Sequence, residues 1–261
     1  MSTISEAFVK AKPRSALIPF LVAGSPTLTT TAKAIEQLDY IGVDIIEIGL
    51  PYSDPLADGP VIQKASLQAI SQGVTIRSIF NMLENLTSFI KTPIVLFCYY
   101  NLIINYGLKN FIEKVQDIGI KGLLIPDLPM EESDLIYKYA AKTNIELILL
   151  VTPTSSYSRI YEIVQKSQGF IYLVSSTGVT GIRSQLGTET YNLLKKIKNI
   201  TDKPIAIGFG ISRKSHAYQI KSWGADGIII GSACVDILTN NNSNDGPLHL
   251  SNFLSEIQKV T

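Results

Sequence analysis

Two acidic residues, Glu47 and Asp58, have the type and spacing that acid–base chemistry needs. Glu47 lies in the short apolar run of residues 44–49, among isoleucines and near the C-terminal end of that run. If the run is a β-strand, Glu47 shares one face with Ile45 and Gly49. Burial disfavours the ionised form of a carboxyl group, so we expect a raised pKa and a general acid near neutral pH. The alternative is a structural Glu47 that pairs with a Lys or Arg across the fold.

The second acid follows in a long loop, residues 50–60, which contains three prolines. Proline fixes φ and lowers the entropy that is lost when a segment becomes ordered. Such a loop can hold a carboxylate above a neighbouring site, and Asp54 and Asp58 are the candidates. Considered alone, either aspartate fits an Asx-turn or a helix N-cap better than a catalytic role.

Two glycine turns have the composition of an anion-binding site. Residues 208–212 follow the seventh apolar run, and Gly231-Ser232 follows the eighth. Glycines at these points let backbone N–H groups approach a phosphate, and a helix N-terminus behind them adds an attractive dipole. Tight turns without a ligand are the alternative, but two such turns in these places favour phosphate.

A small, polar segment with glycines, residues 175–183, follows the sixth apolar run. Its composition suits a mobile lid that closes over a substrate, although a surface loop has the same composition. Aromatic residues near strand ends form a further group, which could line a flat slot or simply belong to the core. They are Phe20, Phe97, Tyr99, Tyr172 and Phe209.

Bringing these candidates together requires regular elements, and short apolar runs alternate with amphipathic runs along the chain. The expected strands are residues 17–22, 45–48, 94–99, 122–125, 147–151, 171–174, 204–207 and 227–230. The expected helices are residues 30–41, 62–71, 76–90, 107–118, 133–143, 156–166, 188–198, 213–223 and 250–260. A short amphipathic helix is also expected within residues 1–12, with Ile4, Ala7 and Phe8 on one side.

Strand–helix alternation implies parallel pairing with right-handed crossovers. Eight such units close naturally into a (β/α)8 TIM barrel, and we expect one domain over residues 1–261 with extra N-terminal and C-terminal helices. An open doubly wound sheet is the alternative. Residues 22–26, after the first strand, lack the G-x-G-x-x-G spacing, which disfavours a dinucleotide site. In a barrel the active site forms at the C-terminal ends of the strands.

Composition narrows the classes of function. The net charge is +1 and Lys and Arg form no run, so nothing favours a nucleic-acid or anionic-membrane partner. The apolar runs are far shorter than the roughly 20 residues that span a bilayer. Cys98 and Cys234 lie in apolar segments and suggest buried thiols in a reducing compartment. His216 and His249 lack neighbours at metal-ligand spacing, so acid–base work falls to carboxylates, Tyr or Lys.

Together these segments resemble the tryptophan synthase alpha chain family. Residues 47–63 closely resemble the family's acidic-loop signature, which is highly specific, whereas the glycine turns alone are not. The other matching segments occur in the family's order over nearly the whole chain. They are residues 19–20, 23–26, 99–101, 126–129, 178–181, 208–211 and 231–232.

The resemblance implies a lyase that cleaves indole-3-glycerol phosphate to indole and glyceraldehyde 3-phosphate. Glu47 and Asp58 match the family's two catalytic acids, and Tyr172 matches a tyrosine beside them. Thr180 matches a lid threonine that hydrogen-bonds near the loop aspartate. The phosphate contacts match Gly181, Gly210, Gly231 and Ser232. The indole pocket matches Phe20, Phe97, Tyr99, Leu124, Leu150 and Phe209.

The resemblance also implies a partner, a beta chain that carries pyridoxal phosphate and receives indole in an α2β2 heterotetramer. Pro51 and Asp54 would lie at that contact. This chain itself is expected to need neither a metal nor an organic cofactor. The N-terminus shows no targeting segment and the composition fits an AT-rich genome, so we expect bacterial cytoplasm or plastid stroma.

Other barrel functions fit less well. A sugar-phosphate epimerase would be expected to use metal-binding histidines at strand ends, and an indole-glycerol phosphate synthase would want a catalytic Lys on a strand. An inactive barrel kept as a regulatory partner would not need both Glu47 and Asp58. A free-standing lyase that acts without a beta chain is left open.

Overall fold

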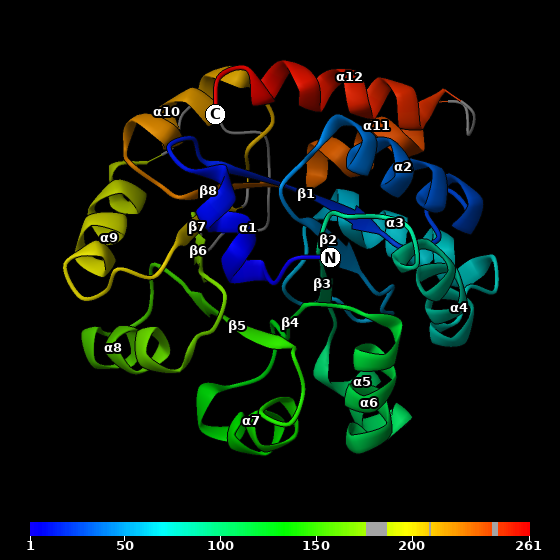
Figure 1. Ribbon diagram of the computed structural model, residues 1–261, viewed down its shortest axis with the longest axis horizontal. Coiled ribbons are helices and arrows are strands. Elements are labelled where there is room, and N and C mark those ends of the chain that lie inside the picture. The colour runs from blue at the N-terminus through cyan, green and yellow to red at the C-terminus, as the bar shows by residue number, and fades with distance from the viewer. Residues whose placement is uncertain (176–186, 209, 242–244) are drawn as a thin grey trace.

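The computed structural model describes residues 1–175, 187–208, 210–241 and 245–261. These residues form a closed barrel of parallel strands in which β8 pairs with β1 (Figure 1). The strands are β1 Ala16–Val22, β2 Ile46–Gly49, β3 Ile94–Phe97, β4 Gly122–Leu124, β5 Glu146–Val151, β6 Ile171–Val174, β7 Ile205–Gly208 and β8 Gly227–Ile230. The predicted (β/α)8 barrel is confirmed, and each predicted strand has its counterpart.

Helices surround the barrel as an outer ring. They are α1 Ile4–Ala11, α2 Leu28–Ile41, α3 Pro60–Ser71, α4 Ile76–Thr87, α5 Tyr100–Tyr106, α6 Leu108–Ile118, α7 Asp134–Ala140, α8 Tyr157–Lys166, α9 Thr188–Lys198, α10 Lys214–Ser222, α11 Ser232–Asn240 and α12 Gly246–Gln258, with a 3-10 turn at Met130–Glu132. The extra N-terminal and C-terminal helices are thus confirmed as α1 and α12.

Two helices, α5 and α11, were missing from the sequence prediction, and α12 begins at Gly246 instead of residue 250. The α5 helix is short and starts three residues after β3 ends, so it has too few turns to show a helical period. The α11 helix starts two residues after β8 ends, and its apolar residues continue the apolar run of that strand. In both places periodicity alone could not separate strand from helix.

The strands present two different faces, as alternation requires. Ile46 and Ile48 of β2 belong to the apolar layer between the barrel and the helices. Ile45 belongs to the second cluster, which fills the barrel interior together with Phe20 and Phe97. Glu47 therefore points into the barrel, as predicted, and its Cα is in register with that of Phe20 on β1.

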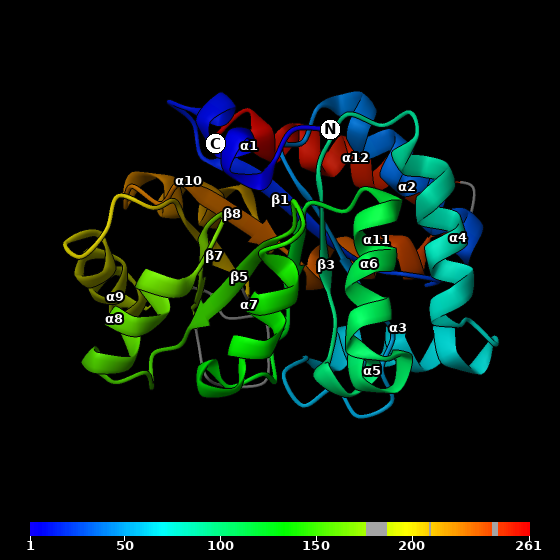
Figure 2. The same ribbon diagram turned by 60° about the horizontal axis from the view of Figure 1, so that its bottom comes forward.

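The N-terminal end of the barrel is closed by α1, which crosses the centre of the view in Figure 1. Ile4 and Phe8 are buried in the interior cluster, and the Phe8 ring lies 5.2 Å from that of Phe170. Gly227 provides the space, because a Cβ there would lie 2.9 Å from the Phe8 ring. Figure 2 shows α1 and both chain termini at one end, with α3 at the other.

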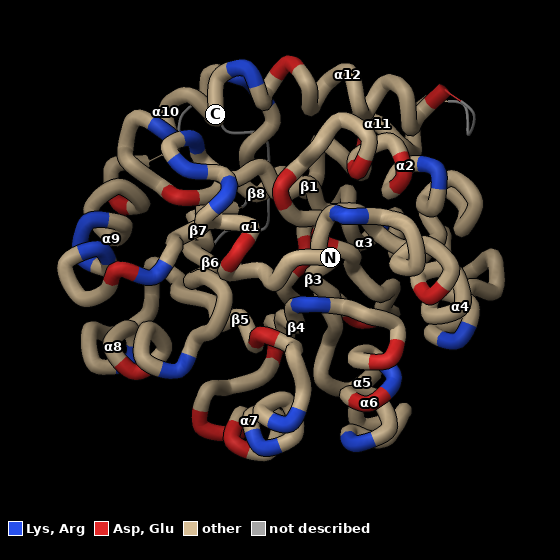
Figure 3. The backbone as a smooth tube through the Cα atoms, viewed as in Figure 1, with Lys and Arg blue, Asp and Glu red and all other residues tan. Residues whose placement is uncertain are grey.

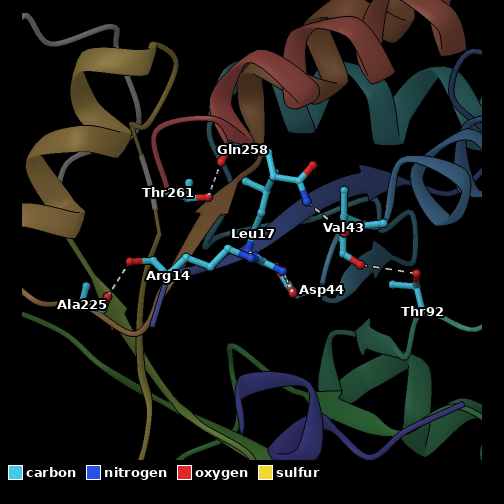
Figure 4. Close-up of polar contacts among 10 residues, drawn as sticks. Arg14, Leu17, Val43, Asp44, Thr92, Ala225, Gln258 and Thr261 are labelled. Atoms are coloured by element: carbon cyan, nitrogen blue, oxygen red, sulfur yellow. Dashed lines mark hydrogen bonds and ion pairs between the residues drawn. The ribbon is translucent and has the colours of Figure 1, made fainter. Parts of the chain in front are cut away.

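Polar contacts fasten the strands at this closed end (Figure 4). The Arg14 guanidinium donates to both oxygens of Asp44 at 2.5 and 2.7 Å, and Asp44 also accepts from the backbone N–H of Leu17. Ser15 Oγ donates to the carbonyl of Ala225, which precedes β8. These bonds join the starts of β1, β2 and β8, so the strand ends opposite the candidate site are held in place.

Charged residues of both signs are spread around the outer ring (Figure 3). Neither sign is confined to one side, which agrees with the net charge of +1. Within the described ranges, no helix has the length and apolar character that crossing a membrane requires.

The closing role of α1 makes a prediction about stability. Phe8→Ala should lower the free energy of unfolding by about 3 kcal/mol or more, because it leaves a cavity at the end of the barrel core. Val9→Ala is the matched control on the same helix, since Val9 is 70% exposed and should change stability by less than about 0.5 kcal/mol. Urea unfolding followed by circular dichroism measures both. Equal losses in the two variants would contradict a closing role for Phe8.

Candidate active site

Glu47 lies inside the barrel near the C-terminal end of β2. Its side chain is 1% exposed, and neither carboxyl oxygen has a hydrogen-bond partner in the described part of the chain. Among the described residues, Glu47 thus forms no structural ion pair with a Lys or Arg. Burial away from water raises the pKa of Glu47 from 4.5 to about 8, and the nearby charge of Asp58 adds to the rise.

Asp58 lies in the loop between β2 and α3 and is also buried. Its Oδ2 accepts a hydrogen bond of 3.0 Å from the Tyr99 hydroxyl, and its carbonyl accepts one of 2.8 Å from Gln63 Nε2. The N-cap of α3 is Gly59, which makes no side-chain capping bond. The side chain of Asp58 is thus held toward the barrel and does not cap the helix.

The two carboxyl groups differ in protonation near neutral pH. Burial raises the pKa of Asp58 from 3.8 to about 6, while the hydrogen bond from Tyr99 works in the opposite direction. Between these two values Asp58 is ionised and Glu47 is protonated. Burial and the charges of both acids hold the pKa of the Tyr172 phenol well above its usual value. The site therefore offers a neutral acid, a carboxylate and a phenol that keeps its proton.

A cavity lies at this end of the barrel, with about 380 Å³ of empty space that includes open solvent at its mouth. Several predicted site residues come together in its wall. Its described lining consists of Phe20, Asp58, Ile62, Phe97, Tyr172, Gly210, Ile229, Gly231 and Ser232. The Phe20 and Phe97 rings meet edge to face with centroids 5.5 Å apart. The apolar wall can accept a flat ring beside one carboxylate.

One part of the wall is made by glycine turns and a helix N-terminus. Gly231 is the N-cap of α11 and Ser232 is its first residue, while Gly210 follows β7 with φ of +77°. The helix that the phosphate hypothesis required behind Gly231 is therefore present as α11. Free N–H groups and the helix dipole can attract an anion here. The described lining contains no Lys, Arg or His.

Two further glycines make room for site side chains. A Cβ on Gly49 would lie 2.6 Å from the Phe20 ring, and a Cβ on Gly208 would lie 2.5 Å from the Tyr172 hydroxyl. The sequence pattern indicated Gly208 only as part of a turn. Ile62 and Ile229 also line the cavity, and the sequence analysis did not predict either of them. Alternation along β8 could have indicated Ile229, whereas no local signal indicates Ile62.

The remaining predicted residues lie in several places. Leu124 is in the interior cluster with Phe97 and Tyr99, and Leu150 packs against that cluster and also lines a second cavity with Asp127. In the loop after β2, Pro51 is half-buried and Asp54 is exposed. Thr180, Gly181 and Phe209 lie outside the described residues.

The cysteines and histidines do not form a reactive or metal-binding centre in the described chain. Cys98 and Cys234 are buried free thiols, as predicted. The described residues contain no group of three or more His, Cys, Asp or Glu that could hold a metal ion.

Fold and site together define a class: a (β/α)8 barrel with two buried carboxyl groups toward the C-terminal ends of its strands, where such barrels carry their active sites. Comparison with known families makes the assignment specific. The family model described as tryptophan synthase alpha chain matches residues 7–259, and the chain belongs to this family.

Individual relatives agree over the full length. The tryptophan synthase alpha chain of Microcystis aeruginosa is 47% identical over 262 residues, covering 100% of this chain and 99% of the relative. That of the red alga Pyropia yezoensis is 48% identical over 260 residues, covering 100% and 99%. A chain of the tryptophan synthase a2b2 complex from Pyrococcus furiosus superposes with a TM-score of 0.89 at 33% identity, covering 95% of this chain and 99% of that one.

The buried state of Glu47 makes a pH-dependent prediction about stability. A carboxyl group whose pKa is raised by folding destabilises the protein as pH rises from its unfolded to its folded pKa. Glu47→Gln removes that penalty, so the variant should match the parent at pH 4 and gain up to about 4 kcal/mol over it by pH 8. Urea unfolding at a series of pH values measures the difference.

Glu256→Gln is the matched control for this experiment. Lys214 and Lys259 lower the pKa of the exposed Glu256 to about 2, so it is ionised in the folded and unfolded states above pH 5. Its effect on stability should therefore stay constant from pH 5 to pH 8. If the difference in unfolding free energy between Glu47→Gln and the parent were constant from pH 5 to pH 8, a neutral buried Glu47 would be contradicted.

Proposed function

We propose that this chain is a lyase that cleaves indole-3-glycerol phosphate to indole and glyceraldehyde 3-phosphate in L-tryptophan biosynthesis. The observation that carries the proposal is the pair of buried acids in different protonation states, one of which, Asp58, lines an apolar cavity. Membership of the tryptophan synthase alpha chain family supports the same substrate.

The reaction is a retro-aldol cleavage of the bond between indole C3 and the glycerol chain. Protonation at C3 must come first, and it leaves positive charge on the ring that is shared with its nitrogen. A fixed carboxylate near that nitrogen stabilises the charge. Asp58 lines the cavity and is ionised above pH 6, so we assign this role to Asp58.

A second group must give a proton to C3 and take one from a glycerol hydroxyl as the bond breaks. Glu47 lies on a rigid strand, is protonated up to about pH 8 and has no competing hydrogen bond among the described residues. We therefore assign both proton transfers to Glu47. Tyr172 keeps its proton at neutral pH, so it can donate a hydrogen bond beside the two acids but cannot remove a proton.

The cavity wall supplies binding. We infer that Phe20, Phe97 and Leu124 hold the indole ring, with Tyr99, Leu150 and Phe209 as the further predicted positions. The phosphate would sit at Gly210, Gly231 and Ser232, where it faces the N-terminus of α11. Gly181 and the proposed lid residue Thr180 complete the assignment.

We further propose a beta chain as partner, in an α2β2 heterotetramer, with pyridoxal phosphate in that partner and no cofactor in this chain. The Pyrococcus furiosus structure is described as a tryptophan synthase a2b2 complex with mutual activation, which supports the partnership. The exposed Asp54, with Pro51 beside it in the same loop, would meet the partner. Cyanobacterial and red algal relatives favour a bacterial cytoplasm or plastid stroma.

The acid assignments predict the behaviour of two variants. Glu47→Gln should lower kcat by roughly 10²- to 10⁴-fold, and Asp58→Asn by about 10²-fold or more. Glu113→Gln, on the exposed surface of α6, should keep the parent rate. In the parent, kcat/KM should fall below about pH 6, where Asp58 is protonated, and above about pH 8, where Glu47 is ionised.

Indole release from indole-3-glycerol phosphate, with and without a beta chain, measures all of these outcomes. No indole in either case would overturn the proposed function. Parent-like rates for Glu47→Gln or Asp58→Asn would remove that residue from its assigned role.

The phosphate assignment predicts an effect on KM. In Gly231→Ala the new methyl group would lie 3.6 Å from the Phe20 ring, so the fold should tolerate it while the anion site becomes narrower. We expect KM to rise by about tenfold or more, with a smaller change in kcat, because the lost interaction binds the ground state and the transition state alike. Gly246→Ala, at the start of α12 and outside the cavity, is the matched control. An unchanged KM would place the phosphate elsewhere.

A further inference from the structure

The Tyr99 hydroxyl lies between two groups of the loop that carries Asp58. It is 3.1 Å from the backbone nitrogen of Ala57 and 3.0 Å from Asp58 Oδ2. A backbone N–H can only donate, so the phenol oxygen accepts that bond and its single proton is directed to Asp58. A proton donor at this oxygen favours the carboxylate form of Asp58 over the acid.

The position of this hydroxyl is fixed by the packing of its ring. Tyr99 is 2% exposed, stacks on Tyr52 with centroids 4.9 Å apart, and meets the edge of Phe97 at 6.0 Å. The described cavity wall does not include Tyr99. The Tyr99 hydroxyl instead contacts Asp58. This contact was not part of the prediction that Tyr99 lines the indole pocket.

We propose that Tyr99 is a positioning residue, whose hydroxyl holds Asp58 as a carboxylate and in one orientation beside the cavity. Gln63 Nε2 fixes the other end of the same residue through its carbonyl. The role in turnover rests on the proposed function, whereas the effect on Asp58 itself does not.

The charges of the groups around Asp58 explain why the hydrogen bond from Tyr99 matters for its ionisation. Among the described residues, Glu47 on β2 and Tyr172 on β6 are the other titratable groups at the site, and Asp127 acts on Tyr99 from the loop after β4. None of these carries a positive charge, and no cation belongs to the described cavity wall. The hydrogen bond from Tyr99 is the influence that lowers the pKa of Asp58 against burial.

Tyr99→Phe tests the proposal, because it removes the hydroxyl and keeps the ring. With ¹³C-labelled aspartate, NMR titration follows the Asp58 carboxyl directly, with its signal assigned from Asp58→Asn. The midpoint should rise by about one pH unit in Tyr99→Phe, since a hydrogen bond to a charged group contributes about that much. This readout needs no substrate and would stand even if indole-3-glycerol phosphate were not turned over.

Kinetics supply the second readout. In Tyr99→Phe, the fall of kcat/KM at low pH should shift to higher pH by the same one unit. The fall at high pH should stay in place. At pH 6, kcat should fall by several-fold with little change in KM, and part of the loss should be recovered at pH 7.5.

Tyr137→Phe is the matched control, since it also removes one phenol hydroxyl that makes a hydrogen bond; this hydroxyl is partly buried and donates to the carbonyl of Lys166 at 2.7 Å. It should reproduce any general loss of stability without moving the Asp58 midpoint or the fall of kcat/KM at low pH. An unmoved midpoint in Tyr99→Phe, or an equal shift in Tyr137→Phe, would overturn the proposal.

Discussion

The site depends on one constraint: a carboxyl group is buried inside an apolar barrel with no hydrogen-bond partner among the described residues. Burying Glu47 has a small free-energy cost only when the group is a neutral acid, because an ionised group would lose its solvation without compensation. The proposed chemistry follows from this, since a buried neutral acid holds a proton at neutral pH. The cost in stability must be offset elsewhere in the fold. The closed sheet and the contacts of Arg14 with Asp44 contribute at the opposite end.

The two ends of the barrel are specialised in different ways, and glycines make both possible. At the closed end, Gly227 leaves space for the Phe8 ring of α1. At the open end, Gly49 and Gly208 leave space for Phe20 and Tyr172. An alanine at any of these three positions would bring a methyl group within 3 Å of an aromatic side chain. The same residue type thus serves core packing at one end and the shape of the cavity at the other.

The parts of this structure that were predictable from sequence are those that local pattern determines. Alternation placed Glu47 inside the barrel because the side chains of a strand alternate whatever the rest of the chain does. Asp58 is different, because its local sequence favours a turn or cap and its actual partner, Tyr99, lies 41 residues away. Ile62 likewise reaches the cavity from a helix, and no local pattern in the sequence indicates this. Family resemblance predicted Asp58 as a site residue, and Asp58 lines the cavity, but the resemblance could not supply the hydrogen bond from Tyr99 that holds it.

The two acids also differ in how they can respond to events outside the barrel. Glu47 lies on β2, which pairs with β1 on one side and with β3 on the other. Its surroundings therefore change only if the barrel itself changes. Asp58 lies in a loop whose other residues include Leu56, with 83% of its surface exposed. Proline at positions 51, 55 and 60 stiffens that loop, so a contact at its exposed part acts on the Asp58 carboxylate and its bond with Tyr99. If the proposed partner covers this loop, it can act on Asp58, the proposed charge stabiliser, while Glu47, the proposed proton carrier, stays unchanged.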